Sequence, residues 1–182
     1  MKPYLVGGIS IIALLPASAA AQSAETTDPL AVFDWMDGRW RGEAWIMTRE
    51  GPVTLVQTER SGEMLDGRIR LVEGKGYNAD GSVGFNALGV IAAAPEGGFV
   101  MRSWTLEQTG SFPIEVDGSG FRWEIPAGPG AVVRYVVTFD GATWSEVGHY
   151  VADGQEPMET FRMELKRVDR TGWPAEGTLA PH

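Results

Sequence analysis

Apolar and polar residues alternate along most of the chain in short runs, and each run ends at glycine, asparagine or aspartate. Turn signals of this kind recur from Glu50-Gly51-Pro52 to Asp153-Gly154, and such residues tolerate the positive φ that hairpin turns require. The runs between them are rich in β-branched and aromatic residues, as in antiparallel strands. We therefore predict ten strands, at about 39–49, 53–64, 68–77, 82–93, 99–108, 111–116, 121–125, 131–139, 142–151 and 157–167.

An antiparallel meander of this length has two exposed edges unless the sheet closes on itself. The predicted fold class is therefore all-β, an up-and-down antiparallel barrel of about ten strands with a short N-terminal helix. Asp28 and Pro29 favour the start of that helix, and Asp37-Gly38 should end it. A barrel of this size encloses room for a small ligand. A flat sheet or a two-sheet sandwich is the alternative, because the number of strands alone does not require closure.

The N-terminal segment has the pattern of a secretory signal peptide. Lys2 precedes an apolar run over residues 5–15, and Ala19-Ala20-Ala21 before Gln22 fits the usual cleavage site. The apolar run is too short for a bilayer, which needs about 20 residues, although an uncleaved anchor or a buried helix remains an alternative. We expect a periplasmic or secreted protein with no membrane span. The predicted organisation is a signal peptide (1–21), a flexible leader (22–28), a barrel domain (29–168) and an irregular C-terminal tail (169–182).

Composition narrows the classes of function. The 182 residues include 15 Lys and Arg against 24 Asp and Glu, and the formal net charge of −9 argues against a nucleic-acid partner. The absence of cysteine excludes disulfides and thiolate metal sites. With only two histidines, we do not expect a metal site built from several histidines. Nucleophile-elbow, phosphate-loop and zinc-protease motifs are missing from the sequence. We therefore assign no catalytic residue and no metal site.

Two segments resemble a known group of barrels. Gly38-Arg39-Trp40-Arg41-Gly42, directly after the predicted helix, resembles the opening of lipocalin-like (calycin) barrels. Residues 141–150 and 161–165 resemble the end of an uncharacterised family of exported bacterial lipocalin-like proteins, known as a domain of unknown function. This resemblance implies a barrel like those of lipocalins and fatty-acid-binding proteins, an internal cavity, and a tryptophan, here Trp40, packed across the closed end. It implies no established activity.

Nitrobindin-type barrels offer a second, weaker resemblance. They share a Gly-x-Trp-x-Gly-x-Gly opening, which Gly38, Trp40 and Gly42 match, whereas Ala44 replaces the last glycine. Such proteins bind haem through a histidine late in the chain, and His149 is the candidate that this resemblance implies. A histidine on a strand is more often a surface or hydrogen-bonded residue. We therefore expect no cofactor, and haem is the alternative.

Alternation along the predicted strands indicates which side chains face the barrel interior. Glu73, Arg102 and Glu146 fall on faces that are otherwise apolar. A buried charge costs several kcal/mol unless it is paired, so these three should meet one another, water or a ligand. Arg102 is suited to orient an acidic or polar ligand head. The candidate ligand-binding residues are Trp40, Glu73, Arg102, Trp104, Trp123, Tyr135, Glu146 and Tyr150.

These patterns favour an exported barrel that binds a small, largely apolar or amphipathic molecule. An enzyme is the first alternative, with Glu73 and Glu146 as an acid and base pair in which burial raises one pKa. A structural or partner-binding protein without a ligand is another, in which the same charges form a salt bridge and the tryptophans fill the core. The sequence leaves the ligand and the oligomeric state open.

Overall fold

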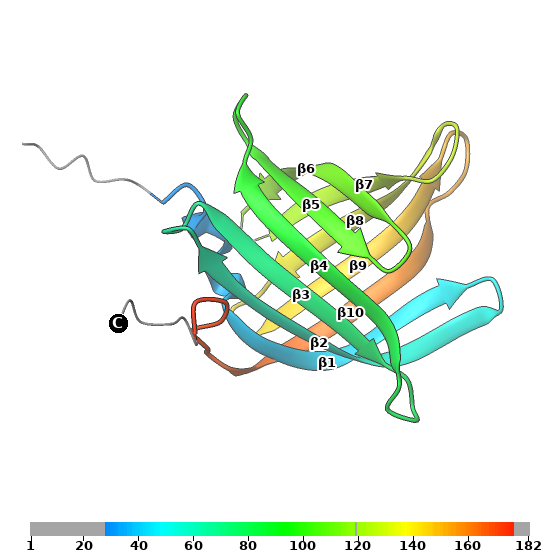
Figure 1. Cartoon of the computed structure of the whole chain (residues 1–182). Helices are drawn as coiled ribbons and strands as arrows, with labels where there is room; N and C mark the ends of the chain where they lie inside the picture. The colour runs from blue at the N-terminus through cyan, green and yellow to red at the C-terminus, as the bar shows by residue number, and fades with distance from the viewer. Residues whose placement is uncertain (1–27, 119, 177–182) are drawn as a thin grey trace, which may run out of the picture.

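The computed structural model describes residues 28–118 and 120–176, so the predicted signal peptide and nearly all of the leader lie outside the described residues. Ten antiparallel strands form one closed barrel in which neighbours follow chain order and β1 pairs with β10 (Figure 1). The predicted all-β barrel is confirmed, and the sandwich alternative is wrong. The strands are β1 (Gly38–Thr48), β2 (Gly51–Met64), β3 (Ile69–Tyr77), β4 (Val83–Ala93), β5 (Phe99–Thr105), β6 (Thr109–Asp117), β7 (Gly120–Pro126), β8 (Ala131–Phe139), β9 (Thr143–Ala152) and β10 (Met158–Asp169).

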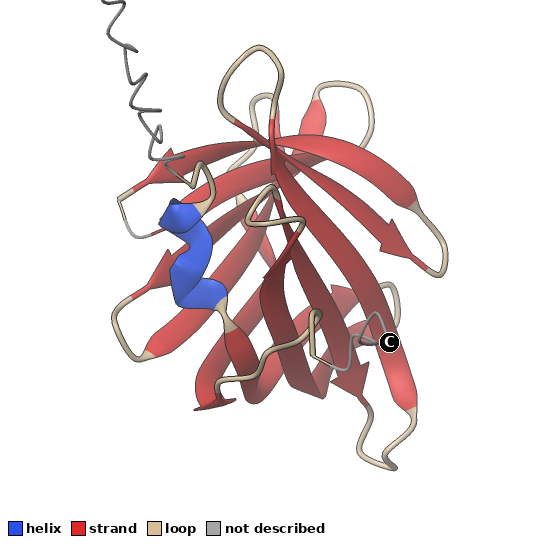
Figure 2. Cartoon of the chain, turned by 60° about the vertical axis from the view of Figure 1, so that its left-hand side comes forward, coloured by secondary structure: helices blue, strands red, loops and turns tan. Residues whose placement is uncertain are grey.

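A short 3-10 helix, η1 (Ala31–Met36), lies across one end of the barrel (Figure 2). The helix was predicted to begin at Asp28 and Pro29, but it begins at Ala31, after a turn in which the Asp28 carboxylate accepts a hydrogen bond from the Leu30 backbone N–H at 2.8 Å. Phe33 and Met36 are three residues apart, one turn of a 3-10 helix, and both are buried. The helix therefore turns one apolar side into the barrel and closes that end.

The buried core gathers beneath this helix. The Phe33 ring packs edge-on against Phe99 at 5.0 Å and Phe121 at 5.6 Å, measured between ring centroids. Trp40 is 1% exposed, and its indole nitrogen donates a hydrogen bond to the Met36 carbonyl at 2.7 Å. The close packing expected for Trp40 at the closed end is thus present, and each large ring buried there contributes about 2 kcal/mol or more.

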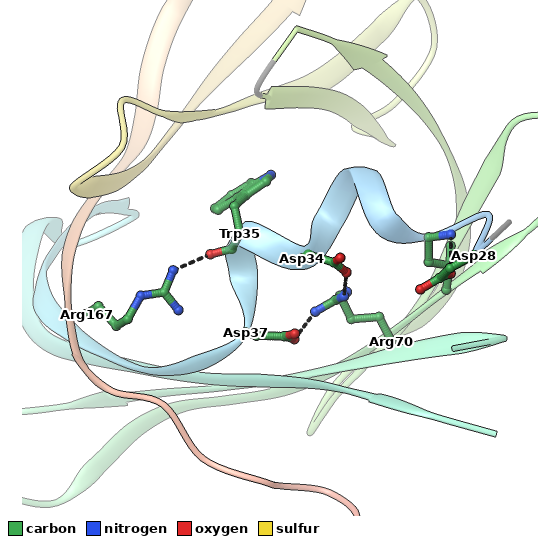
Figure 3. A network of polar contacts seen from close by, with 7 residues as sticks. Asp28, Asp34, Trp35, Asp37, Arg70 and Arg167 are labelled. Atoms are coloured by element: carbon green, nitrogen blue, oxygen red, sulfur yellow. Dashed lines mark hydrogen bonds and ion pairs between the residues drawn. The ribbon is translucent and has the colours of Figure 1, made fainter. Parts of the chain in front are cut away.

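Charged groups also hold the helix in place (Figure 3). The Arg70 side chain is fully buried and donates to the carboxylates of Asp34, at 2.7 Å, and Asp37. Arg167 donates to the Trp35 carbonyl at 2.6 Å, and its guanidinium lies 4.1 Å from the centre of the Trp40 ring. The two inward-facing arginines at the closed end therefore have partners in or beside the helix.

The chain after β10 packs on the outside of the barrel. The Arg60 guanidinium lies over the Trp173 ring, 4.5 Å from its centre. A Cβ on Gly62 would lie 1.9 Å from the Trp173 carbonyl oxygen, so glycine is required where the tail crosses β2. Within the described residues, no helix is long and apolar enough to cross a membrane.

Candidate functional site

Three strands supply most of the candidate site, and on all three the sequence pattern predicted the inward face correctly. Trp123 on β7 is the register partner of Tyr135 on β8, which is in turn the partner of Gly148 on β9. Register partners share a face of the sheet, and Glu146 and Tyr150 share that face with Gly148 because side chains alternate. Four of the candidate residues, Trp123, Tyr135, Glu146 and Tyr150, therefore face the interior.

Four aromatic rings form a row along this inner wall. The Trp123 and Tyr135 rings stack with centroids 4.4 Å apart and planes 13° apart. Phe112 on β6 lies 5.5 Å from Trp123, and Phe161 on β10 lies 5.8 Å from Tyr135. Gly148 leaves room for this row, since a Cβ there would lie 2.8 Å from Tyr135 Cε1. All four rings are only half-buried, in contrast to the core beneath the helix.

Glu146 lies beside the aromatic row. Its Oε1 accepts a hydrogen bond from the indole nitrogen of Trp123 at 3.0 Å. Burial raises the pKa of Glu146 to about 7, although the hydrogen bond from Trp123 lowers it. Burial and the charge of Glu146 together raise the pKa of Tyr135 to about 12. Glu146 is thus a carboxyl group that gains or loses its proton near neutral pH.

A second inward-facing carboxyl, Glu59 on β2, was not predicted. It lies on the same face of β2 as Leu55, Gln57 and Ser61, all of which are buried. Gln57 Nε2 donates to Glu59 Oε1 at 2.7 Å. The register partner of Glu59 is Gly74, where a Cβ would lie 2.6 Å from Glu59 Oε1. The inward face of β2 is rich in polar residues, so its alternation did not identify the side that faces the interior. The glycines at 74 and 76 of the next strand could have indicated that larger side chains of β2 lie opposite them inside the barrel.

The pKa of Glu59 depends on the charge of Glu146 as well as on burial. Burial raises the pKa of Glu59 to about 8, and the charges of Glu146 and Glu73 add to the rise against the hydrogen bond from Gln57. Both side chains are half-buried, so each keeps some accessible surface inside the wall. At neutral pH this part of the interior holds protonated or partly ionised carboxyls, which can donate a hydrogen bond or, once ionised, balance a positive charge.

The alternative of an acid and base pair formed by Glu73 and Glu146 inside the barrel does not agree with the position of Glu73. Glu73 faces outward on β3, where it binds Arg60 and, at 3.3 Å, Lys75. These partners lower the pKa of Glu73 although burial opposes them. The inward side of β3 carries the buried Arg70, Gly74 and Gly76 instead. The structure therefore places Glu73 and Glu146 on opposite faces of the barrel wall.

Arg102 and Trp104 are likewise on the outer face, contrary to the prediction. Both are exposed, and the Arg102 guanidinium lies 5.6 Å from the centre of the Trp104 ring. The inward face of β5 carries Phe99 and Met101, which pack in the core. Apolar residues occur on both faces of this strand, so alternation alone did not identify the inner one. Arg102 cannot orient a ligand inside the barrel from this position.

His149, the haem-ligand candidate, lies on the outward register of β9. Its register partners are Arg134 on β8 and Glu159 on β10. Haem binding was an alternative drawn from resemblance, and it stays an untested prediction. Among the described residues, no group of three or more His, Asp and Glu side chains is arranged to hold a metal ion.

Two grooves lie on the outer wall, away from the aromatic row. The first, of about 390 Å³, is lined by Arg39, Trp40, Arg41, Thr58, Glu59, Arg60, Glu73, Lys75, Tyr77 and Val168. The second, of about 580 Å³, is lined by Arg41, Gly42, Glu43, Thr54, Leu55, Val56, Tyr77 and Ala79. In the first groove Arg39 is already paired with Asp169, and Arg60 and Lys75 with Glu73. Both grooves lie outside the barrel, and the ion pairs already occupy most charged side chains of the first, so we place the candidate site on the inner wall beside the aromatic row.

Comparison with known proteins supports the fold and no finer assignment. No family model matches the chain, and no match is found among curated proteins. The crystal structure of Rv2717c from M. tuberculosis is similar, with a TM-score of 0.59 and 14% sequence identity. The match covers 77% of this chain and 97% of that one. The chain therefore shares its barrel fold with a solved structure at low sequence identity.

Proposed function

We propose that this chain is an exported, lipocalin-like protein that binds a small, largely apolar ligand inside the barrel. One observation carries the proposal: the inward-facing aromatic row of Phe112, Trp123, Tyr135 and Phe161 keeps accessible surface. Aromatic side chains around a few polar groups are typical of small-molecule sites. A ligand on these rings would remove apolar surface from water, at about 25 cal/mol per Å².

The contrast between the two halves of the barrel supports this proposal. Beneath the helix, side chains such as Phe33, Trp40 and Leu165 are 1% exposed or less. Farther along the wall, the inward-facing Val133, Tyr135 and Tyr150 are all half-buried. A barrel that served only as a scaffold would gain stability by filling both halves equally. The uneven filling favours ligand binding over a purely structural role.

Export and family membership belong to the same proposal. The pattern of residues 1–21 and the resemblance of residues 38–42 to the opening of calycin barrels support an exported lipocalin-like protein. A periplasmic or secreted location after cleavage near Ala21 follows from that pattern.

A second candidate is acid–base catalysis on a small molecule by Glu59 and Glu146. Raised pKa values of about 8 and about 7 near an aromatic wall favour it, because a general acid or base works best with a pKa close to the operating pH. This candidate replaces the predicted pair of Glu73 and Glu146, which the structure separates. Turnover of a bound molecule, measured by mass spectrometry over time, would distinguish catalysis from binding.

Fluorescence of the neutral apolar dye N-phenyl-1-naphthylamine tests the binding proposal. We expect the dye to bind the protein spanning residues 22–182. The Val133→Trp variant, which adds bulk to the inward face of β8, should bind the dye at least tenfold more weakly. Val136→Trp is the matched control, because Val136 lies on the outward face of the same strand and is 42% exposed. Equal dye binding by both variants, or no binding by the parent protein, would contradict the proposal.

A further inference from the structure

The charged groups of the inner wall indicate which charge the ligand carries, in addition to its apolar character. Two carboxyl groups face the interior: Glu146 lies beside the aromatic row, and Glu59 lies close enough for the charge of Glu146 to raise its pKa. Each has one oxygen engaged by a neutral donor, Gln57 for Glu59 and Trp123 for Glu146. Among the hydrogen bonds of residues 28–118 and 120–176, the second oxygen of each carboxyl has no partner. These oxygens are free to meet a ligand.

Basic side chains do not balance these carboxyls from inside. Within the described part of the chain, Arg70 and Arg167 are the basic residues that face inward. Arg70 is bound by Asp34 and Asp37, and Arg167 lies over Trp40, so both are engaged at the closed end. The other cations near this wall, such as Arg60 and Lys75, pair with Glu73 outside. The interior around the aromatic row therefore carries acidic groups without matching positive charge.

Two buried carboxyl groups near each other cost stability, and glutamine would fill the same space at lower cost. Aromatic faces attract cations through the negative potential above the ring. Carboxylates and aromatic rings on one wall are thus complementary to a positive group attached to an apolar body. Once these carboxyls are ionised, an acidic ligand would meet repulsion at the same place.

Resting on the proposed function, we propose that the interior ligand is an amphiphilic organic cation, an amine or quaternary ammonium, held by Glu59, Glu146 and the rings of Trp123 and Tyr135. The cationic head lies between the free carboxylate oxygens and the stacked rings. The apolar body extends along Phe112 and Phe161 toward the half-buried end of the barrel. The ionised carboxylates supply the charge that the ligand neutralises.

Three probes that share an eight-carbon chain and differ in head group distinguish the effect of charge on affinity from that of apolar burial. They are octyltrimethylammonium, octanol and octanoate, each measured in competition with N-phenyl-1-naphthylamine. We expect octyltrimethylammonium to bind about tenfold more tightly than octanol at pH 8, and octanoate to bind most weakly. Glu146→Gln and Glu59→Gln should each reduce the preference for the cation severalfold and leave octanol binding unchanged. Glu164→Gln, which removes the same charge from the outer face of β10, should keep the full preference.

The pH dependence provides a second readout, because the charge of octyltrimethylammonium does not titrate. Its affinity should rise between pH 6 and 9 as Glu146 and Glu59 lose their protons. The other titratable or charged groups that face this region are Tyr135 on β8, Tyr150 on β9, and Arg70 and Arg167 at the closed end. Glu73 lies on the outer face, and its charge also raises the pKa of Glu59. In the double variant Glu59→Gln and Glu146→Gln, the affinity should be independent of pH over this range.

The outcomes separate this inference from the proposed function. If the dye binds and all three octyl probes compete equally, the apolar site stands and the cation proposal is overturned. A preference for octanoate, or a cation preference that survives both glutamine variants, overturns it as well. If neither the dye nor any probe binds, checked by calorimetry, the proposed function and this inference both fail.

Discussion

The indole nitrogen of Trp123 donates a hydrogen bond to Glu146 Oε1 at 3.0 Å, which joins β7 to β9 across the intervening β8. Tyr135 on β8 stacks on the Trp123 ring, so the bond and the stack restrain the indole together. This arrangement places a carboxyl group of nearly neutral pKa against an aromatic surface.

Loss of that hydrogen bond should raise the pKa of Glu146. In Trp123→Phe the ring remains but the donor is gone, and the donor stabilises the ionised carboxylate. We expect the pKa to rise from about 7 by about one unit, as followed by carbon NMR of labelled glutamate side chains, with Glu146→Gln to assign the signal. Trp104→Phe on the outer face is the control. An unchanged titration in Trp123→Phe would show that burial alone sets this pKa.

Glu59 should make folding less favourable as pH rises. Its pKa is about 8 in the folded chain and near 4.5 when unfolded, so between these values the unfolded state loses the proton while the folded state keeps it. The free energy of unfolding therefore falls from pH 4.5 to 8. Glu59→Gln should match the parent near pH 4.5 and be more stable at pH 9 by on the order of 3 kcal/mol.

Urea unfolding at several pH values measures this difference. Glu164→Gln serves as the reference, since Glu164 is exposed on the outer face of β10. Stability curves for Glu59→Gln and the parent protein that run parallel over the whole range would refute the prediction.

The charged contacts of Arg70 should stabilise the closed end of the barrel. The double variant Asp34→Asn and Asp37→Asn leaves a fully buried guanidinium without an ionised partner. We expect it to lower the free energy of unfolding by about 3 kcal/mol. Arg70→Met should cost less, because an apolar chain of similar length replaces the charge and leaves behind two carboxylates that water can reach. Thermal and urea unfolding measure both, and the reverse order would contradict this account.

Export predicts a defined N-terminus. When the full chain is produced in a bacterium with a periplasm, the mature protein should begin at Gln22, and intact mass should show it. Ala21→Arg should block cleavage, because the last position of the cleavage motif requires a small residue. Ala20→Gln should be processed normally, because the middle position is permissive. Normal processing of Ala21→Arg, or recovery of the uncleaved parent chain from the cytoplasm, would argue against a signal peptide.

The sequence by itself determined the strands, the order of the meander and the inward faces of β7, β8 and β9. Turn residues and alternation are local properties, and on these strands the Phe, Trp and Tyr residues lie on one face only. Trp123, Tyr135, Glu146 and Tyr150 were therefore placed correctly. The presence of a short helix before Gly38 was also predicted from local signals, although it begins at Ala31 and not at Pro29.

Tertiary structure decided which charges share the interior. Glu59 and Glu146 belong to strands that are far apart in sequence and come near each other only because the barrel closes between β1 and β10. Glu73 faces outward, where it meets Arg60 and Lys75, because the other face of β3 carries the buried Arg70, Gly74 and Gly76. Arg102 faces outward because Phe99 and Met101, on the other face of β5, pack in the core. Alternation along one strand defines two faces, and only packing against other strands selects the one that is buried.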